Sequence, residues 1–185
     1  MAKILSAMSG GVDSTVATRI LLDEGHDVVG ATLDLFCHPG NDDHVRNARE
    51  ACDLLGIEHR VYNARTAFYE RVISPFVETY LAGETPNPCV VCNRRIKFGL
   101  LVEYAIEEGF DAVATGHYAR IDEDPATGRV LLRNGSDPVK DQSYVLYGLT
   151  QHQLAHARFP LGSMGKDAVR RIANDNRFSS AQAKE

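Results

Sequence analysis

The sequence lacks any apolar run that approaches the ~20 residues of a membrane-spanning helix. Its first residues, from Met1 to Ser6, hold one lysine and too short an apolar stretch for a secretory signal. Internal repeats and low-complexity tracts are also missing, which argues against solenoid and fibrous architectures. These absences predict a cytoplasmic protein without a membrane partner.

Cysteine is scarce, since the 185 residues include only Cys37, Cys52, Cys89 and Cys92. Disulfides are rare in the cytosol, so the C-x-x-C pair of Cys89 and Cys92 indicates metal, cluster or sulfur chemistry rather than a covalent staple. An excess of positive charge is lacking as well. The net charge of −5 argues against a wide nucleic-acid footprint and leaves room for a local one.

Short apolar segments alternate with helical stripes along most of the chain. Strands are predicted at 3–7, 28–33, 59–62 and 112–114. Helices are predicted after them: a stripe at 16–21 that ends before Gly25, a helix from a cap at 41–43 to about 55, and helices at 68–81 and 93–108. This alternation predicts an α/β fold, an open Rossmann-like parallel sheet with helices on both faces. A β-hairpin is expected at 120–133 and a last helix at 166–176. We expect one domain over residues 1–150, with residues 151–185 as its small C-terminal helical extension.

The strongest local signal is S-G-G-V-D-S at residues 9–14, between the first predicted strand and helix. Two glycines let backbone N–H groups turn toward an anion, and the helix N-terminus adds further donors and a positive dipole end. The hydroxyls of Ser9 and Ser14 can donate to phosphate oxygens, while Asp13 is placed to hold a cation. The Walker A spacing is missing. The spacing alone predicts an anion site, and simple helix capping is the structural alternative.

Two further strand ends are candidates for nucleotide contact, because ligands of open parallel sheets lie beyond the carboxyl ends of the strands. Leu33 could pack on an adenine ring or serve only as a core leucine. Gly116 would allow a ribose or adenine to approach closely, whereas His117 alone is more often structural.

The segment T-P-N-P-C-V-V-C-N at residues 85–93 is the second strong feature. Its prolines predict an extended approach to a helix that begins at Asn93. Cys92 would then lie at a helix N-terminus, which should lower its thiol pKa and favour the thiolate. Half of a structural zinc site is the alternative, although no second half is visible. The basic run 93–97 is a candidate for phosphate contact or a solvated helix face.

Five motifs in order carry a family resemblance: S-G-G-V-D-S, T-P-N-P-x-x-x-C-N-x-x-I-K-F, A-T-G-H-Y-A-R, K-D-Q-S-Y and F-P-L-G. Over nearly the whole chain, they resemble the tRNA-specific 2-thiouridylases. These are PP-loop ATP pyrophosphatases with an adenine nucleotide alpha hydrolase-like fold. The resemblance implies that ATP adenylates O2 of the wobble uridine in tRNA, and that sulfur from a cysteine persulfide replaces this oxygen.

The resemblance also implies roles for individual residues. Those for catalysis are Cys92, Cys89 and Asp13, with Asp13 near Mg²⁺. Those for ATP are Ala7, Met8, Ser9, Gly10, Gly11, Val12, Asp13, Ser14, Leu33 and Gly116. Those for the target base are Asn87, Pro88 and Cys89, and those for tRNA or the adenylated intermediate are Lys140, Asp141 and Gln142.

The sequence differs from the family's pattern at two points. Many members have aspartate at the position of Cys89, and members with C-x-x-C are proposed to hold a 4Fe–4S cluster that a third cysteine completes. The family's D-x-C-F segment, which supplies that cysteine, and its central and C-terminal β domains are absent from these 185 residues. Either this is a truncated or unusually short member of the family, or a second chain or homodimer completes the site. A sulfur donor protein or sulfide is expected as a further partner.

Two rival functions remain open at this point. A PP-loop synthetase with another acceptor would keep the phosphate loop, but its ammonia chemistry needs no thiolate. A non-catalytic nucleotide- or tRNA-binding fragment would lack the second active cysteine.

Overall fold

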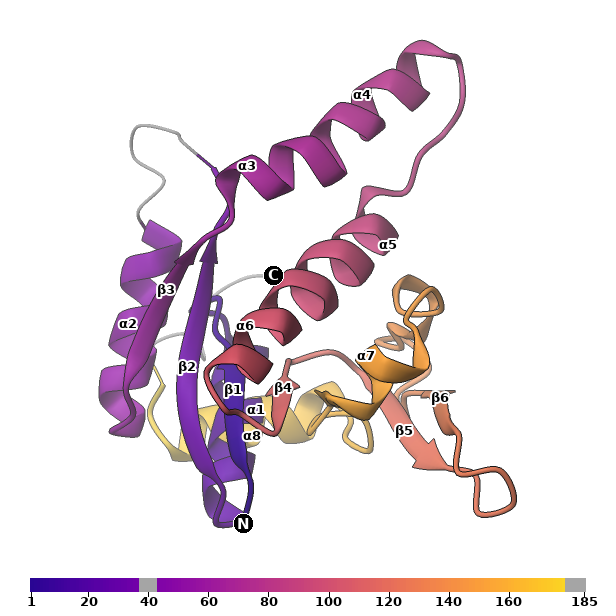
Figure 1. The fold of residues 1–185 in the computed structure, drawn as a ribbon. Coiled ribbons are helices and arrows are strands. Elements are labelled where there is room, and N and C mark those ends of the chain that lie inside the picture. The colour runs from indigo at the N-terminus through magenta and orange to yellow at the C-terminus, as the bar shows by residue number, and fades with distance from the viewer. Residues whose placement is uncertain (37–42, 179–185) are drawn as a thin grey trace.

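The protein has an α/β fold, seen in a computed structural model that describes residues 1–36 and 43–178 (Figure 1). A five-stranded sheet has the order β3-β2-β1-β4-β7, and every pairing in it is parallel. The strands are β1 (Lys3–Ala7), β2 (Asp27–Asp34), β3 (His59–Asn63), β4 (Ala112–Ala114) and β7 (Ala157–Arg158). The four predicted strands are confirmed, whereas the two-residue β7 was not predicted.

Both faces of the sheet are buried, as the apolar runs of its strands require. Ile4 and Val28 point to one face and pack with Leu21 of α1 (Val12–Asp23). Leu5 and Val29, one residue further along each strand, point to the other face and pack with the helix that follows the cysteine segment. Since side chains alternate along a strand, this register places one row of each strand in each core.

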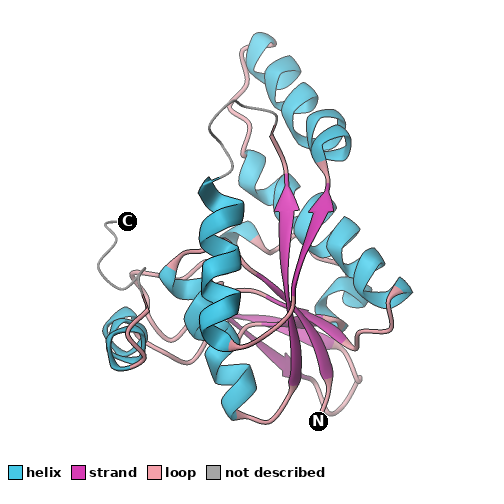
Figure 2. Cartoon of the chain, turned by 90° about the vertical axis from the view of Figure 1, so that its left-hand side faces the viewer, coloured by secondary structure: helices cyan, strands magenta, loops and turns pink. Residues whose placement is uncertain are grey.

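Helices cover the two faces, as predicted (Figure 2). On one face lie α1 and α2 (Asp43–Leu55), and α8 (Lys166–Asp175) packs against α1. On the other face lie η2 (Asn93–Leu100), which is a π-helix, and α6 (Leu101–Glu107). Cys52 of α2 can approach β2 because Gly30 has no side chain; a Cβ there would lie 2.4 Å from the Cys52 sulfur.

An arm stands away from the sheet, at the upper right of Figure 1. It consists of α3 (Arg65–Phe68), the π-helix η1 (Tyr69–Ile73) and α4 (Ser74–Leu81). Helix α4 has no buried residue. Pro75 follows η1 and has no N–H to donate, so the preceding turn cannot close its regular α-helical hydrogen bond. The arm and the loop after it lead the chain out and back to the cysteine segment.

The cysteine helix begins five residues earlier than predicted. α5 (Pro88–Cys92) continues directly into η2 and α6, so one rod runs from Pro88 to Glu107. Asn87, not Asn93, is the N-cap: its side-chain oxygen accepts the Cys89 N–H at 3.1 Å, and Pro88 takes the first helical position. The prediction that Cys92 lies at the helix N-terminus is therefore wrong.

The remaining elements lie beside the sheet. β5 (Ala119–Glu123) and β6 (Val130–Asn134) form the predicted antiparallel hairpin. The 3₁₀-helix η3 (Ser143–Val145) and the short α7 (Gln151–Ala155) follow it. Among the described helices, none is long and apolar enough to cross a membrane.

Candidate active site

A pocket of about 430 Å³ opens at the carboxyl ends of β1, β2 and β4. It brings together most residues predicted to bind ATP: Ala7, Met8, Ser9, Asp13, Ser14, Leu33 and Gly116. Gly10, Gly11 and Val12 shape the loop beside the pocket without lining it. Residues not predicted to bind ATP also line it, among them Thr32, Leu35, Phe36, His44, Lys97, Thr115 and His117.

The S-G-G-V-D-S loop at residues 9–14, called the phosphate loop below, is held in shape by hydrogen bonds of its own serines. The Ser14 hydroxyl donates to the Gly11 carbonyl at 3.0 Å and accepts the Ser9 N–H at 3.3 Å. Gly11 is the N-cap of α1 and provides no side-chain acceptor to the first turn. The N-terminus of this 12-residue helix therefore offers backbone donors and its positive dipole end to an anion in the pocket.

Two glycines set the walls of this loop. Gly10 has a φ of 77°, and a Cβ there would lie 2.5 Å from the Cβ of Asn47 in α2. At Gly116 a Cβ would lie 2.8 Å from the Asp13 carbonyl carbon and 2.9 Å from the Ser14 nitrogen. The loop after β4 therefore contacts the phosphate loop backbone to backbone, and this contact closes one side of the pocket.

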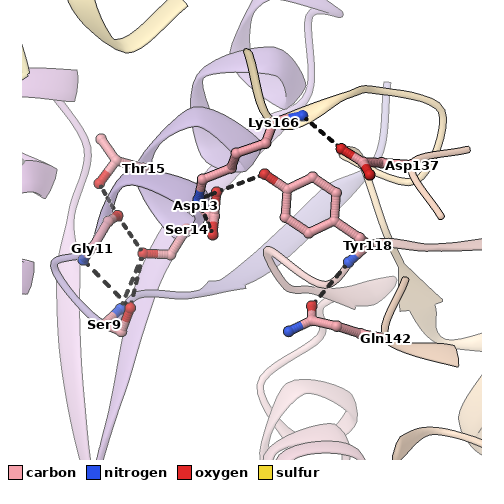
Figure 3. Close-up of polar contacts among 9 residues, drawn as sticks. All are labelled: Ser9, Gly11, Asp13, Ser14, Thr15, Tyr118, Asp137, Gln142 and Lys166. Carbon is pink, nitrogen blue, oxygen red and sulfur yellow. Dashed lines mark hydrogen bonds and ion pairs between the residues drawn. The ribbon is translucent and has the colours of Figure 1, made fainter. Parts of the chain in front are cut away.

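Asp13 is held by two residues from distant parts of the chain (Figure 3). The Lys166 ammonium lies 2.8 and 2.9 Å from its two oxygens, and the Tyr118 hydroxyl donates to one of them at 2.8 Å. Lys166 begins α8, and its backbone N–H donates to the Asp137 side chain at 3.1 Å. Hydrogen bonds from Lys166, Val139 and Lys140 N–H groups hold the pKa of Asp137 below its usual range. The final helix thus brings a lysine to Asp13, on the side of this carboxylate away from the pocket lining.

The described residues fit a magnesium ion carried by phosphates better than one held in a protein cage. Asp13 is the single carboxylate that lines the pocket, and no group of three metal-ligating side chains occurs within the described residues. Mg²⁺ commonly takes one or two protein carboxylates together with substrate phosphates and water. Asp13 would hold such an ion and share its oxygens with Lys166.

His117 is buried at the back of the pocket, with 9% of its surface exposed. Its Nδ1 is 2.8 Å from the Thr115 hydroxyl, and its ring packs near the rings of Phe98 and Phe159. Burial, with a smaller contribution from the positive charge of Lys97, lowers the His117 pKa to about 3. His117 is therefore neutral at physiological pH and presents an uncharged imidazole to the ligand.

This neutral histidine predicts a loss of stability in acid. Its folded pKa lies below the ordinary value near 6.5, so its stabilising contribution is complete above pH ~6.5 and declines as the pH falls toward 3. Between pH 7 and pH 5 the wild type should lose about 2 kcal/mol of unfolding free energy through this residue. Urea unfolding of wild type and His117→Gln at both pH values measures it. Equal pH dependence in the two proteins would contradict the assignment.

Cys92 is half-buried and packs with Phe68, Val72 and Ile96. Burial raises the pKa of its thiol, and the positive charge of Lys97 offsets only part of this effect. The predicted fall in pKa is therefore wrong, because Cys92 lies inside the helix and not at its N-terminal donors. Cys89, in the first turn, is exposed. Neither cysteine lines the pocket, but Leu33 and Leu35 belong both to its wall and to the cluster around Cys92.

Residues 2–185 match the family described as tRNA methyl transferase HUP domain. The chain belongs to this family. It is similar to the tRNA-specific 2-thiouridylase MnmA of Treponema denticola, with 48% identity over 180 residues that cover 94% of this chain and 49% of the relative. The chain spans about half the length of the curated relatives it matches.

Solved structures share the fold at low sequence identity. A 4-thiouridine synthetase in complex with RNA and bound ATP has a TM-score of 0.70 at 18% identity, covering 100% of this chain and 43% of that one. The U34-tRNA thiolase NcsA from Methanococcus maripaludis, solved with its 4Fe–4S cluster, has a TM-score of 0.61 at 20% identity, covering 96% and 58%. These likenesses confirm the predicted α/β fold with its parallel sheet.

A 4Fe–4S cluster does not fit the described residues of this family member. Such a site needs at least three thiolates, and the described part of the chain brings only Cys89 and Cys92 together. Cys52 is fully buried between α2 and β2, and this burial raises the pKa of its thiol to about 12. Cys37, named above as a further cysteine, lies outside the described residues.

The predicted tRNA-contacting residues divide between two environments. Gln142 lines the pocket, and its side-chain oxygen accepts the Tyr118 N–H at 3.1 Å. Asp141 accepts hydrogen bonds from the Gly135 N–H and the Ser143 hydroxyl. Lys140 ends the turn at 138–140, and its backbone N–H donates to the Asp137 side chain. Gln142 is therefore the member of this motif that the fold brings to the nucleotide pocket.

Proposed function

We propose that this chain carries the ATP-dependent part of a tRNA 2-thiouridylase, which transfers sulfur to position 2 of the wobble uridine. One observation carries the proposal. A pocket with a phosphate-binding helix N-terminus shares its wall, through Leu33 and Leu35, with the cluster that holds Cys92. This arrangement would place an activated base between the nucleotide and a sulfur-bearing thiol.

The first step of the proposed reaction is adenylation. The uridine O2 attacks the α-phosphorus of ATP, a P–O bond forms, and pyrophosphate leaves. The α1 N-terminus and the hydroxyls of Ser9 and Ser14 would bind the phosphates, and Asp13 would hold Mg²⁺, which supplies charge neutralisation when bound. Gly116 would allow the ribose to lie close to the loop.

The second step is sulfur transfer. The terminal sulfur of a persulfide on Cys92 attacks C2 of the uridine, the C–O bond breaks, and AMP leaves with the oxygen. A second thiol then cleaves the S–S bond, which leaves a disulfide for a reductant. The persulfide itself would come from a sulfur donor protein or from sulfide with an oxidant. Cys89, one helical turn before Cys92, is the nearest described candidate for the second thiol.

The family description names methyl transfer, whereas the curated relatives are named for thiolation. The cysteine helix favours thiolation, because two cysteines at i and i+3 beside a nucleotide pocket serve sulfur chemistry and have no role in binding a methyl donor. We also propose a cytoplasmic location, where ATP and tRNA are both present.

Incubation with ATP, Mg²⁺, unmodified tRNA and either a persulfide donor or sulfide with an oxidant tests the proposal. We expect tRNA-dependent release of pyrophosphate and AMP, together with 2-thiouridine detected by nucleoside mass spectrometry. Anaerobic iron and acid-labile sulfide analysis of the same protein should show no stoichiometric iron. Binding of ATP and tRNA without either product would instead identify a nucleotide- and tRNA-binding module.

A further inference from the structure

The helix segment after Cys92 is wound as a π-helix over eight residues, Asn93–Leu100. A π-helix joins residue i to i+5, and such segments are rare and often lie at functional sites. In an α-helix, residues five apart point about 140° away from each other. In a π-helix, which has more residues per turn, this offset is much smaller. The winding of η2 therefore brings Lys97 closer to the side of the rod on which Cys92 lies.

A contact from outside the helix accompanies this winding. Gln153 of α7 donates its side-chain amide to the Arg94 carbonyl at 2.8 Å. Gly99 lies one π-turn further on, where a Cβ would be 3.0 Å from the same carbonyl oxygen. A side chain that inserts into the backbone hydrogen-bond ladder of a helix and binds one of its carbonyls is a recognised cause of irregular winding.

The consequence is an asymmetric placement of the basic run. Arg94 and Arg95 are exposed, whereas Lys97 is half-buried and lines the nucleotide pocket. Of the described residues that line this pocket, Lys97 alone is a lysine or arginine. Its charge acts on both neighbouring groups, since it favours the Cys92 thiolate and disfavours protonated His117. Lys97 therefore shares the pocket lining with His117 and lies near enough to Cys92 for its charge to act on both.

We propose that Lys97 is the phosphate-binding cation of this pocket, brought there by the π-winding of η2 and shared with Cys92. Its ammonium contacts the phosphates of the bound nucleotide and neutralises the charge that grows between the leaving AMP and the attacking sulfur. The sulfur part rests on the proposed function. The phosphate part concerns nucleotide binding alone, and its test needs neither tRNA nor a sulfur donor.

The test compares affinities for α,β-methylene ATP and for adenosine by titration calorimetry at low salt. A charge-assisted hydrogen bond to phosphate corresponds to a tenfold to hundredfold change in affinity, so Lys97→Met should lose about that much for the ATP analogue. Adenosine should bind within about twofold of wild type, because it has no phosphate. Lys97→Arg should restore most of the lost affinity. Arg95→Met, on the exposed side of the same helix, is the matched control and should bind as wild type does.

Three outcomes separate the ideas. Equal binding of the ATP analogue by wild type and Lys97→Met overturns the inference, and so does an equal loss for analogue and adenosine, which indicates a structural role. A phosphate-selective loss in a protein that makes no 2-thiouridine keeps the phosphate role and rejects the proposed function.

Discussion

Replacement of Cys92 by serine is expected to reduce tRNA thiolation at least about 1000-fold, as removal of a covalent nucleophile does in other enzymes. Serine keeps the size of the side chain, so the packing with Phe68, Val72 and Ile96 should persist. It cannot carry a persulfide, so the sulfur-transfer step is lost. Affinity for α,β-methylene ATP should stay within twofold, because Cys92 does not line the pocket.

Cys52→Ser is the matched control, since it makes the same substitution at a cysteine of α2 that is fully buried against Gly30 of β2. It should keep its specific activity and lose about 1–3 kcal/mol of stability through the buried hydroxyl. Measurement of 2-thiouridine by mass spectrometry, alongside urea unfolding, separates the two effects. Full thiolation by Cys92→Ser would contradict the role of Cys92 in sulfur transfer. The rival function, a PP-loop synthetase with another acceptor, would then be favoured.

The second large effect is expected at Gly116. In Gly116→Ala the new methyl group would lie within 3.0 Å of three backbone atoms of Asp13 and Ser14, so the phosphate loop or the loop after β4 must move. A displacement of this kind in a binding loop can cost about 100-fold, and we expect such a loss in affinity for the ATP analogue. Stability should fall by about 1–3 kcal/mol, the usual cost of overpacking.

Gly148→Ala controls for the loss of a glycine as such. A Cβ at Gly148 would meet the Arg94 side chain at 3.6 Å and Val90 at 3.9 Å, which are ordinary contacts. This variant should bind the nucleotide normally. Tight binding of the ATP analogue by Gly116→Ala would show that the two loops need not touch in the bound state.

The sequence was sufficient to predict the sheet and the phosphate loop, because both rest on short-range patterns. Apolar runs marked the strands from β1 to β4, and S-G-G-V-D-S marked the first helix terminus. The two residues of β7 and the five of α7 are too few to show a period. They take their conformation from pairing with β4 and from the Thr150–Gln153 capping box.

The cysteine helix shows where local signals were misread. Asn87 followed by Pro88 is a regular N-cap and first-turn pair, whereas the two prolines of this segment also predict an extended chain. The thiol pKa of Cys92 was consequently predicted in the wrong direction. No local pattern predicts the placement of Lys97, since the side chain that hydrogen-bonds to the carbonyl within η2, Gln153, lies 59 residues away from it.

Long-range partners explain the rest of what the sequence could not show. Lys166 and Asp13 are 153 residues apart and meet only because α8 packs on α1. No spacing rule links them, and the charge pair is visible only once the helices are placed. The residues of the phosphate loop that line the pocket lie within one turn and one helix start, so a local sequence pattern can predict that they lie together.

The arm formed by α3, η1 and α4 and the rod from Pro88 to Glu107 should differ in the free energy of local unfolding. Helix α4 buries no residue, whereas the rod from Pro88 to Glu107 carries Ile96, Phe98 and Leu101 at 0% exposure. Local opening costs least where few apolar contacts are lost, so the amides of α4 should exchange with solvent far sooner than those of the rod. The chain between them, residues 82–87, ends at Asn87, the N-cap of the rod. Both thiols therefore belong to the start of the slowly exchanging rod, directly after the segment that joins it to the arm.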